Sequence, residues 1–152
     1  MIHIRLPPEL CERLIAALRD AGLREIGGIM MAEHTGAEEF TVRDLTIHRR
    51  GTWISFVRTL TEAVLGLRRF FERTQGAYTR FNYLGEWHSH PSFSTQPSST
   101  DDASMRAIVC DHSVGATFAV LVILKLDVNG MLSGSAHTYL PDGSKQVSCL
   151  DY

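Results

Sequence analysis

The stretch that most restricts the fold is "ATFAVLVILKL", residues 116–126, which is the most apolar run in the chain. Gly115 and Asp127 bound it, and β-branched and aliphatic residues dominate it. A membrane-spanning helix needs about 20 apolar residues, so this run is too short to be one. A short, continuous apolar run is typical of a strand that is covered on both faces. We therefore expect the central, fully buried strand of a sheet here.

The segments around this run alternate between strand and helix patterns. Residues 2–7 alternate as a strand does, and residues 7–22 then have prolines at the start of a helical pattern and Gly22 at its end. We further expect a hairpin over 25–48, a helix over 59–76, a strand over 81–90, a helix over 101–112 and a hairpin around the turn at 127–130. The apolar stripe of the helix over 59–76 consists of Leu60, Val64, Leu67 and Phe71. Because regular βαβ units are missing from this order, we expect an α/β fold with a mixed sheet flanked by helices.

Length, charge and cysteine content restrict the class of protein. A chain of 152 residues is of ordinary size for one domain, and we treat residues 1–152 as a single domain. The formal net charge of −2 gives no general electrostatic reason to bind nucleic acid, and neither a signal peptide nor a membrane span is visible. Cys11, Cys110 and Cys149 are odd in number and far apart, which argues against a disulfide framework. We expect a cytoplasmic protein that binds neither nucleic acid nor membrane.

The segment "WHSHP" places two histidines one residue apart at the end of a predicted strand. Successive side chains of a strand point to opposite faces, so His88 and His90 point to the same face. Neutral imidazole is a common zinc ligand, and a catalytic zinc site usually has three protein ligands and one open position. Asp101 follows a loop that is long enough to bring its carboxylate back to the strand end. His88, His90 and Asp101 are therefore a candidate zinc site.

Simpler structural explanations exist for the same residues. The two histidines fit a solvent-exposed strand end, and "SSTD" has the spacing of a helix capping box in which Asp101 replaces the usual Glu or Gln. Other local signatures of catalysis, such as HExxH, the PCxxC of zinc deaminases, GxSxG and the P-loop, are missing from the sequence. Cys110 and His112, which are separated by one residue, carry little weight, because a nucleophile and its base normally meet through the fold.

His88, Ser89, His90, seven further residues, Ser98, two residues and Asp101 together resemble the signature of the JAMM metalloproteases, also called JAB or MPN-plus domains. That pattern includes an upstream glutamate at a strand start, and "REIGGIM" supplies Glu25. The resemblance spans nearly the whole chain. It implies the JAB/MPN fold, which is cytidine-deaminase-like, and one catalytic Zn²⁺ bound by His88, His90 and Asp101. It also implies that Glu25 is the general base for the attacking water and that Ser98 donates a hydrogen bond to the oxyanion.

The resemblance also implies a substrate class. It points to an isopeptidase or peptidase that cleaves after the C-terminal glycine of a ubiquitin-like protein, and it is strongest to bacterial members encoded beside E1-like and E2-like proteins in antiphage defence operons. A substrate tail is most simply bound as an added strand, for which we expect the segment "RRGTWISFVRT" to supply a sheet edge. Candidate substrate-binding residues are Arg49, Arg50, Trp53 and Phe93. Processing of a sulfur-carrier or other small precursor protein, and a non-catalytic scaffold of the same fold, remain alternatives.

Overall fold

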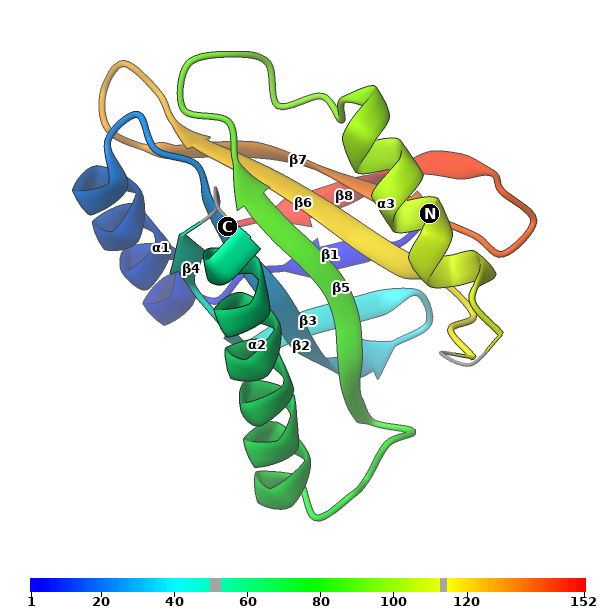
Figure 1. The fold of residues 1–152 in the computed structure, drawn as a ribbon. Coiled ribbons are helices and arrows are strands. Elements are labelled where there is room, and N and C mark those ends of the chain that lie inside the picture. Colours follow the sequence, from blue (N-terminus) through cyan, green and yellow to red (C-terminus); the bar gives the residue numbers. More distant parts are fainter. Residues whose placement is uncertain (50–52, 113–114) are drawn as a thin grey trace.

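Strands and helices alternate along the part of the chain that the computed structural model describes, which is residues 1–49, 53–112 and 115–152, with the backbone alone for residues 53–62. Three helices occur in this part: α1 (Pro8–Ala21), α2 (Trp53–Arg73) and α3 (Ser99–Cys110). Eight strands accompany them (Figure 1): β1 (His3–Arg5), β2 (Ile26–Gly36), β3 (Glu39–Leu45), β4 (His48–Arg49), β5 (Phe81–Ser89), β6 (Ala119–Leu126), β7 (Leu132–Tyr139) and β8 (Lys145–Asp151).

The strands form one mixed sheet that closes on itself. The strand order is β3-β1-β8-β7-β6-β5-β2-β4, and β3 pairs with β2 as well as with β1. Strand β1 is parallel to both of its neighbours and β5 is parallel to β6, whereas the remaining pairs are antiparallel. Seven strands thus form a ring, and β4 lies outside it beside β2. The mixed sheet with its helices confirms the expected α/β class, while closure of the sheet was not expected.

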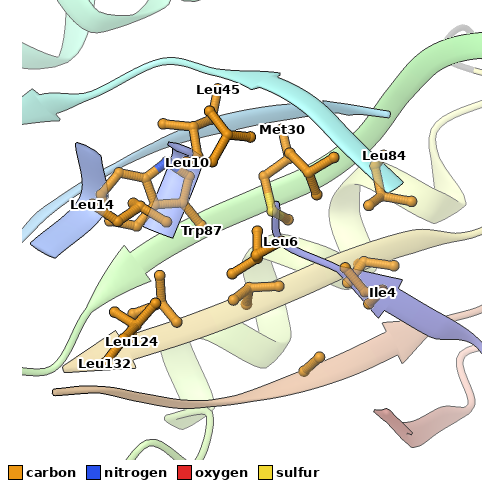
Figure 2. Close-up of a cluster of buried hydrophobic side chains, with 14 of the residues drawn as sticks. Ile4, Leu6, Leu10, Leu14, Met30, Leu45, Leu84, Trp87, Leu124 and Leu132 are labelled. Carbon is orange, nitrogen blue, oxygen red and sulfur yellow. The ribbon is translucent and has the colours of Figure 1, made fainter. Parts of the chain in front are cut away.

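The core fills both sides of β6, because alternate side chains of a strand point to opposite faces. Val120, Val122 and Leu124 belong to the larger cluster, into which α1 packs Leu10 and Leu14. Figure 2 shows this cluster enclosed by strands, with Ile4, Met30, Leu84, Trp87 and Leu124 facing one another. On the opposite face, Ala119, Leu121 and Ile123 pack against Met105 and Val109 of α3. The prediction of a central strand buried on both faces is confirmed.

Helix α2 begins earlier than the sequence suggested, and the expected sheet edge over "RRGTWISFVRT" is wrong from Trp53 onward. The reason is the spacing of Trp53, Val57 and Leu60, which continues the helical apolar pattern of residues 60–71 toward the amino terminus.

Among the helices that the structure describes, none combines the length and the apolar character that a membrane crossing requires.

The buried face of α2 also differs from the expected stripe. Ala63 and Phe70 are buried, whereas Val64 is 58% exposed. Gly66 explains this difference, because a Cβ atom there would lie 2.7 Å from the Cγ2 atom of Thr46. Helix α2 therefore approaches the sheet along the face that carries Ala63, Gly66 and Phe70.

Candidate metal centre

The carboxyl-terminal end of β5 carries two buried histidines. Gly27 of β2 pairs with His88 on one side of β5, and the backbone N–H of His90 donates to the Leu124 carbonyl of β6 on the other, at 2.9 Å. His88 is 1% and His90 4% exposed. The two Nε2 atoms lie 3.0 Å apart. The prediction that both imidazoles share one face is confirmed.

Asp101, in the first turn of α3, completes the group. Its Oδ1 atom lies 3.4 Å from His88 Nε2, and its Oδ2 atom lies 3.7 Å from His90 Nε2. The donor atoms of the three residues all lie within 4.8 Å of one another. Ligands of a tetrahedral zinc ion with bonds of about 2.0–2.1 Å are about 3.3 Å apart, so these separations fit a zinc ion with little movement. The residues present, two imidazoles and a carboxylate, also fit zinc chemically.

The loop after β5 fixes the orientation of His90. Its Nδ1 atom lies 2.6 Å from the Ser94 carbonyl oxygen. A carbonyl oxygen accepts hydrogen bonds only, so Nδ1 carries the proton and, in the neutral ring, the lone pair of Nε2 is available to bind a metal ion. The hydroxyl group of Ser135, on β7, donates to the Thr95 carbonyl and thereby ties the same loop to the sheet. The sequence analysis missed Ser135, because only the fold brings β7 beside this loop.

Ser98 and Asp101 form the capping box that their spacing suggested. The Ser98 hydroxyl oxygen accepts from the Asp101 backbone N–H, and the Ser98 backbone N–H donates to Asp101 Oδ2 at 2.8 Å. The Ser98 hydroxyl also donates to Oδ2, at 2.7 Å. Burial raises the pKa of Asp101, but the hydrogen bonds from Ser98 and the nearby histidines outweigh burial, so the pKa lies below its usual value. Helix cap and candidate metal ligand are thus the same carboxylate.

Glu25 lies immediately before β2 and is half-buried. The backbone N–H of Ile26 donates to the Ser89 hydroxyl at 3.0 Å, which joins this segment to β5. The antiparallel register pairs Gly27 with His88, and continuing it by two residues places Glu25 opposite His90. The backbone of Glu25 therefore lies one residue from the contact between Ile26 and Ser89, and Ser89 stands between the two histidines in the chain.

The structure describes some of the candidate substrate-binding residues and not others. Phe93 is 49% exposed, and its ring packs on that of His90 with centroids 4.3 Å apart. Arg49 is exposed on β4 and pairs with Ile26, next to Glu25 in the chain. Arg50 lies outside the described residues, as does the side chain of Trp53, whose backbone begins α2. Trp87, which precedes His88, is buried and donates from Nε1 to the Thr46 carbonyl at 2.9 Å.

Comparison with known proteins identifies a family and a fold for this chain. Residues 7–135 match the family described as prokaryotic homologs of the JAB domain. A "CD-NTase/cGAS isopeptidase" of Enterobacter hormaechei subsp. hoffmannii (strain UCI 50) is 29% identical over 125 residues, which cover 82% of this chain and 68% of that protein. Two proteins whose structures were determined in solution share the fold at 19% identity and cover 97% of this chain. They come from Desulfitobacterium hafniense (TM-score 0.62, 92% of that chain) and Salinibacter ruber (TM-score 0.53, 90% of that chain).

Proposed function

This chain belongs to the family of prokaryotic homologs of the JAB domain, and we propose on that premise that it is a zinc-dependent isopeptidase or peptidase. We propose cleavage after the C-terminal glycine of a ubiquitin-like protein as its reaction. The observation that carries the proposal is the convergence of His88, His90 and Asp101 within 4.8 Å of one another, beside the segment that holds Glu25. A scaffold protein has no need to bury two histidines against a carboxylate in this way.

His88, His90 and Asp101 would hold the zinc ion. When bound, zinc lowers the pKa of a coordinated water to about 7 and polarises a substrate carbonyl. Glu25, which directly precedes Ile26, would accept the proton of the attacking water and deliver it to the departing amine. The hydrogen bond from His90 Nδ1 to Ser94 holds the imidazole in one orientation, which such a site requires.

Ser98 is the donor that we propose for the oxyanion. Its hydroxyl has one proton, which here goes to Asp101 Oδ2. The backbone N–H of Ser98 also binds Oδ2, so the hydroxyl can turn toward a substrate while Asp101 stays in place. The capping box therefore holds the ligand independently of the Ser98 proton.

The related isopeptidase and the edge of the sheet support the substrate class. That relative is called a CD-NTase/cGAS isopeptidase, and we extend isopeptidase activity to this chain. Among the described strands, β4 has a neighbour on one side only, namely β2, so an extended tail can add as a strand along its other side, beside Arg49. Phe93, half-exposed against His90, offers an apolar surface to the residues near the scissile bond. We propose a ubiquitin-like protein or its conjugates as substrate, with E1-like and E2-like partners in a bacterial antiphage pathway.

Glu25→Gln tests this function most directly. The purified wild type should contain one zinc ion per chain and should cleave a ubiquitin-like protein that is extended beyond its terminal glycine. The variant keeps the three ligands but lacks the base, so it should bind zinc normally and cleave about 10²–10⁴-fold more slowly.

Glu12→Gln is the matched control, because Glu12 is exposed on α1, remote in the chain from the motif, and the substitution is the same. A wild type that carries no zinc, or a Glu25→Gln variant that cleaves as fast as the control, would contradict the proposal.

A further inference from the structure

A second group of metal-ligating side chains lies on strands β1 and β8, apart from the first. His3 of β1 and Cys149 and Asp151 of β8 offer an imidazole nitrogen, a thiol sulfur and a carboxylate oxygen that all lie within 4.8 Å of one another. The Cys149 Sγ atom is 3.8 Å from Asp151 Oδ1. In the sheet order, β7 and β6 separate β8 from β5, which carries His88 and His90. The two groups therefore share no residue and no strand.

The strand register, and not a flexible loop, brings these three side chains together. In the parallel β1–β8 ladder, His3 is the partner of Cys149, so both point to the same face. Asp151 follows Cys149 by two residues and shares that face. The opposite face belongs to the core, where Ile4 is fully buried and Leu150 packs against the main cluster. The group is thus fixed on the outer surface of a rigid part of the sheet.

The chemistry of the group favours a zinc-like ion. Thiolate, imidazole and carboxylate are the three side-chain ligands that zinc accepts, and hard ions such as Mg²⁺ and Ca²⁺ prefer oxygen alone. Glu39 is the partner of His3 on its other side, in the β1–β3 ladder, but its carboxylate is not part of this group. Arg5 pairs with Asp151 across β1 and β8 and is the cation that competes for this carboxylate.

We propose that His3, Cys149 and Asp151 form a second divalent-metal site, of the zinc type, that links the first and last strands of the chain. The site is structural, because it joins β1, a strand of only three residues, to β8 across a parallel ladder. The site uses neither Glu25 nor the motif at the end of β5, so it can be tested independently of the proposed catalysis.

Cobalt titration of the full-length protein tests this site. A thiolate ligand gives Co²⁺ a near-ultraviolet charge-transfer band, and the site of His88, His90 and Asp101 contains no sulfur. The wild type should bind two equivalents of Co²⁺ and show the band. Cys149→Ser should bind one equivalent and lose the band. Cys110→Ser is the matched control, because Cys110 is exposed on α3, and it should retain both signals.

A second variant tests the same site independently, in case Cys149→Ser misfolds. His3→Asn changes an exposed side chain, and it should weaken binding of the second equivalent without affecting the first. Zinc in excess should raise the thermal midpoint of wild type more than that of either variant, by roughly 5–10 °C at a hundredfold excess over Kd. A wild type that binds a single equivalent without the band, or a band that persists in Cys149→Ser, would overturn the proposal.

Discussion

Asp101 shows how one carboxylate can serve both local structure and chemistry. Its Oδ2 atom closes the capping box with Ser98, while Oδ1 faces His88 at 3.4 Å. Oδ2 also lies 3.7 Å from His90 Nε2, so one oxygen takes part in both the cap and the candidate site. The capping hydrogen bonds also explain why the carboxylate can approach two imidazoles without rotating away. The first turn of α3 is therefore part of the candidate metal centre.

Ser98→Ala tests this arrangement at the residue scale. Loss of the capping hydroxyl should lower the free energy of unfolding by about 1 kcal/mol. Loss of a donor to the oxyanion should lower kcat by about 10²–10³-fold, and KM should change little. Urea unfolding and steady-state cleavage measure the two effects separately.

Ser99→Ala is the control, because Ser99 is the exposed neighbour in the same turn and takes no part in the capping box. If Ser98→Ala loses stability but keeps its kcat, Ser98 is a helix cap only.

At the scale of elements, the close contact of β2 with β5 positions both histidines. A Cβ atom on Gly27 would lie 2.6 Å from the Trp87 carbonyl oxygen and 2.9 Å from the His88 Cβ atom. A Cβ atom on Gly28 would lie 2.0 Å from the Thr46 carbonyl oxygen. The two glycines thus permit close backbone approach. A bulge occurs farther along β2, where the register shifts after Met30 and Met31.

Gly27→Ala should therefore disturb the metal centre as well as the sheet. The added methyl group must push β5 away, so we expect a loss of about 1–3 kcal/mol in unfolding free energy and weaker zinc binding. Unfolding in urea and competition with a chromophoric chelator measure these quantities. Gly36→Ala is the control, since a Cβ atom there meets only the flexible side chain of Glu39. Equal zinc affinity in the two variants would refute the positioning role.

At the scale of the whole molecule, an ion-pair group on β2, β3 and the start of β5 joins elements far apart in the chain. Glu33 is 6% exposed and accepts from Arg43 Nε and Arg80 Nε, each at 2.7 Å. The hydrogen bonds from Arg80 and Arg43 hold the pKa of Glu33 below its usual value. Because the charged form is favoured in the folded state, this group stabilises the fold at neutral pH.

The sign of this effect gives a pH prediction. The pKa is lowered by folding, so the stabilisation is present above the unfolded pKa of about 4.3 and is lost as pH falls through the folded value. Glu33→Gln should lower the free energy of unfolding by about 1 kcal/mol at pH 7. The effect is this small because the Arg43 and Arg80 side chains are 44% and 65% exposed, so solvent screens both ion pairs. In urea unfolding curves, the difference in unfolding free energy between wild type and Glu33→Gln should become smaller below pH 4. A difference that stays constant from pH 7 to pH 3 would show that packing, and not charge, is responsible.

Much of the fold and the metal centre could be predicted because the signals are local. The two-residue period of β5 gives the shared face of His88 and His90, and the spacing of Ser98 and Asp101 gives the cap. Closure of the ring could not be predicted, because it depends on β1 and β8, which are short or largely polar and bury few side chains. Which face of α2 is buried could not be predicted either, because it is set by the contact between Gly66 and Thr46.

Closure of the sheet has a consequence for how the molecule behaves in concentrated solution. Exposed strand edges are templates for edge-to-edge aggregation, and proteins protect or remove them. Here seven of the described strands are paired on both sides, and the strand outside the ring, β4, has two residues. An edge this short can hold a single extended peptide weakly but cannot seed a growing sheet. Among the described strands, the ring thus limits the unpaired edge to β4 and protects the other strands from self-association.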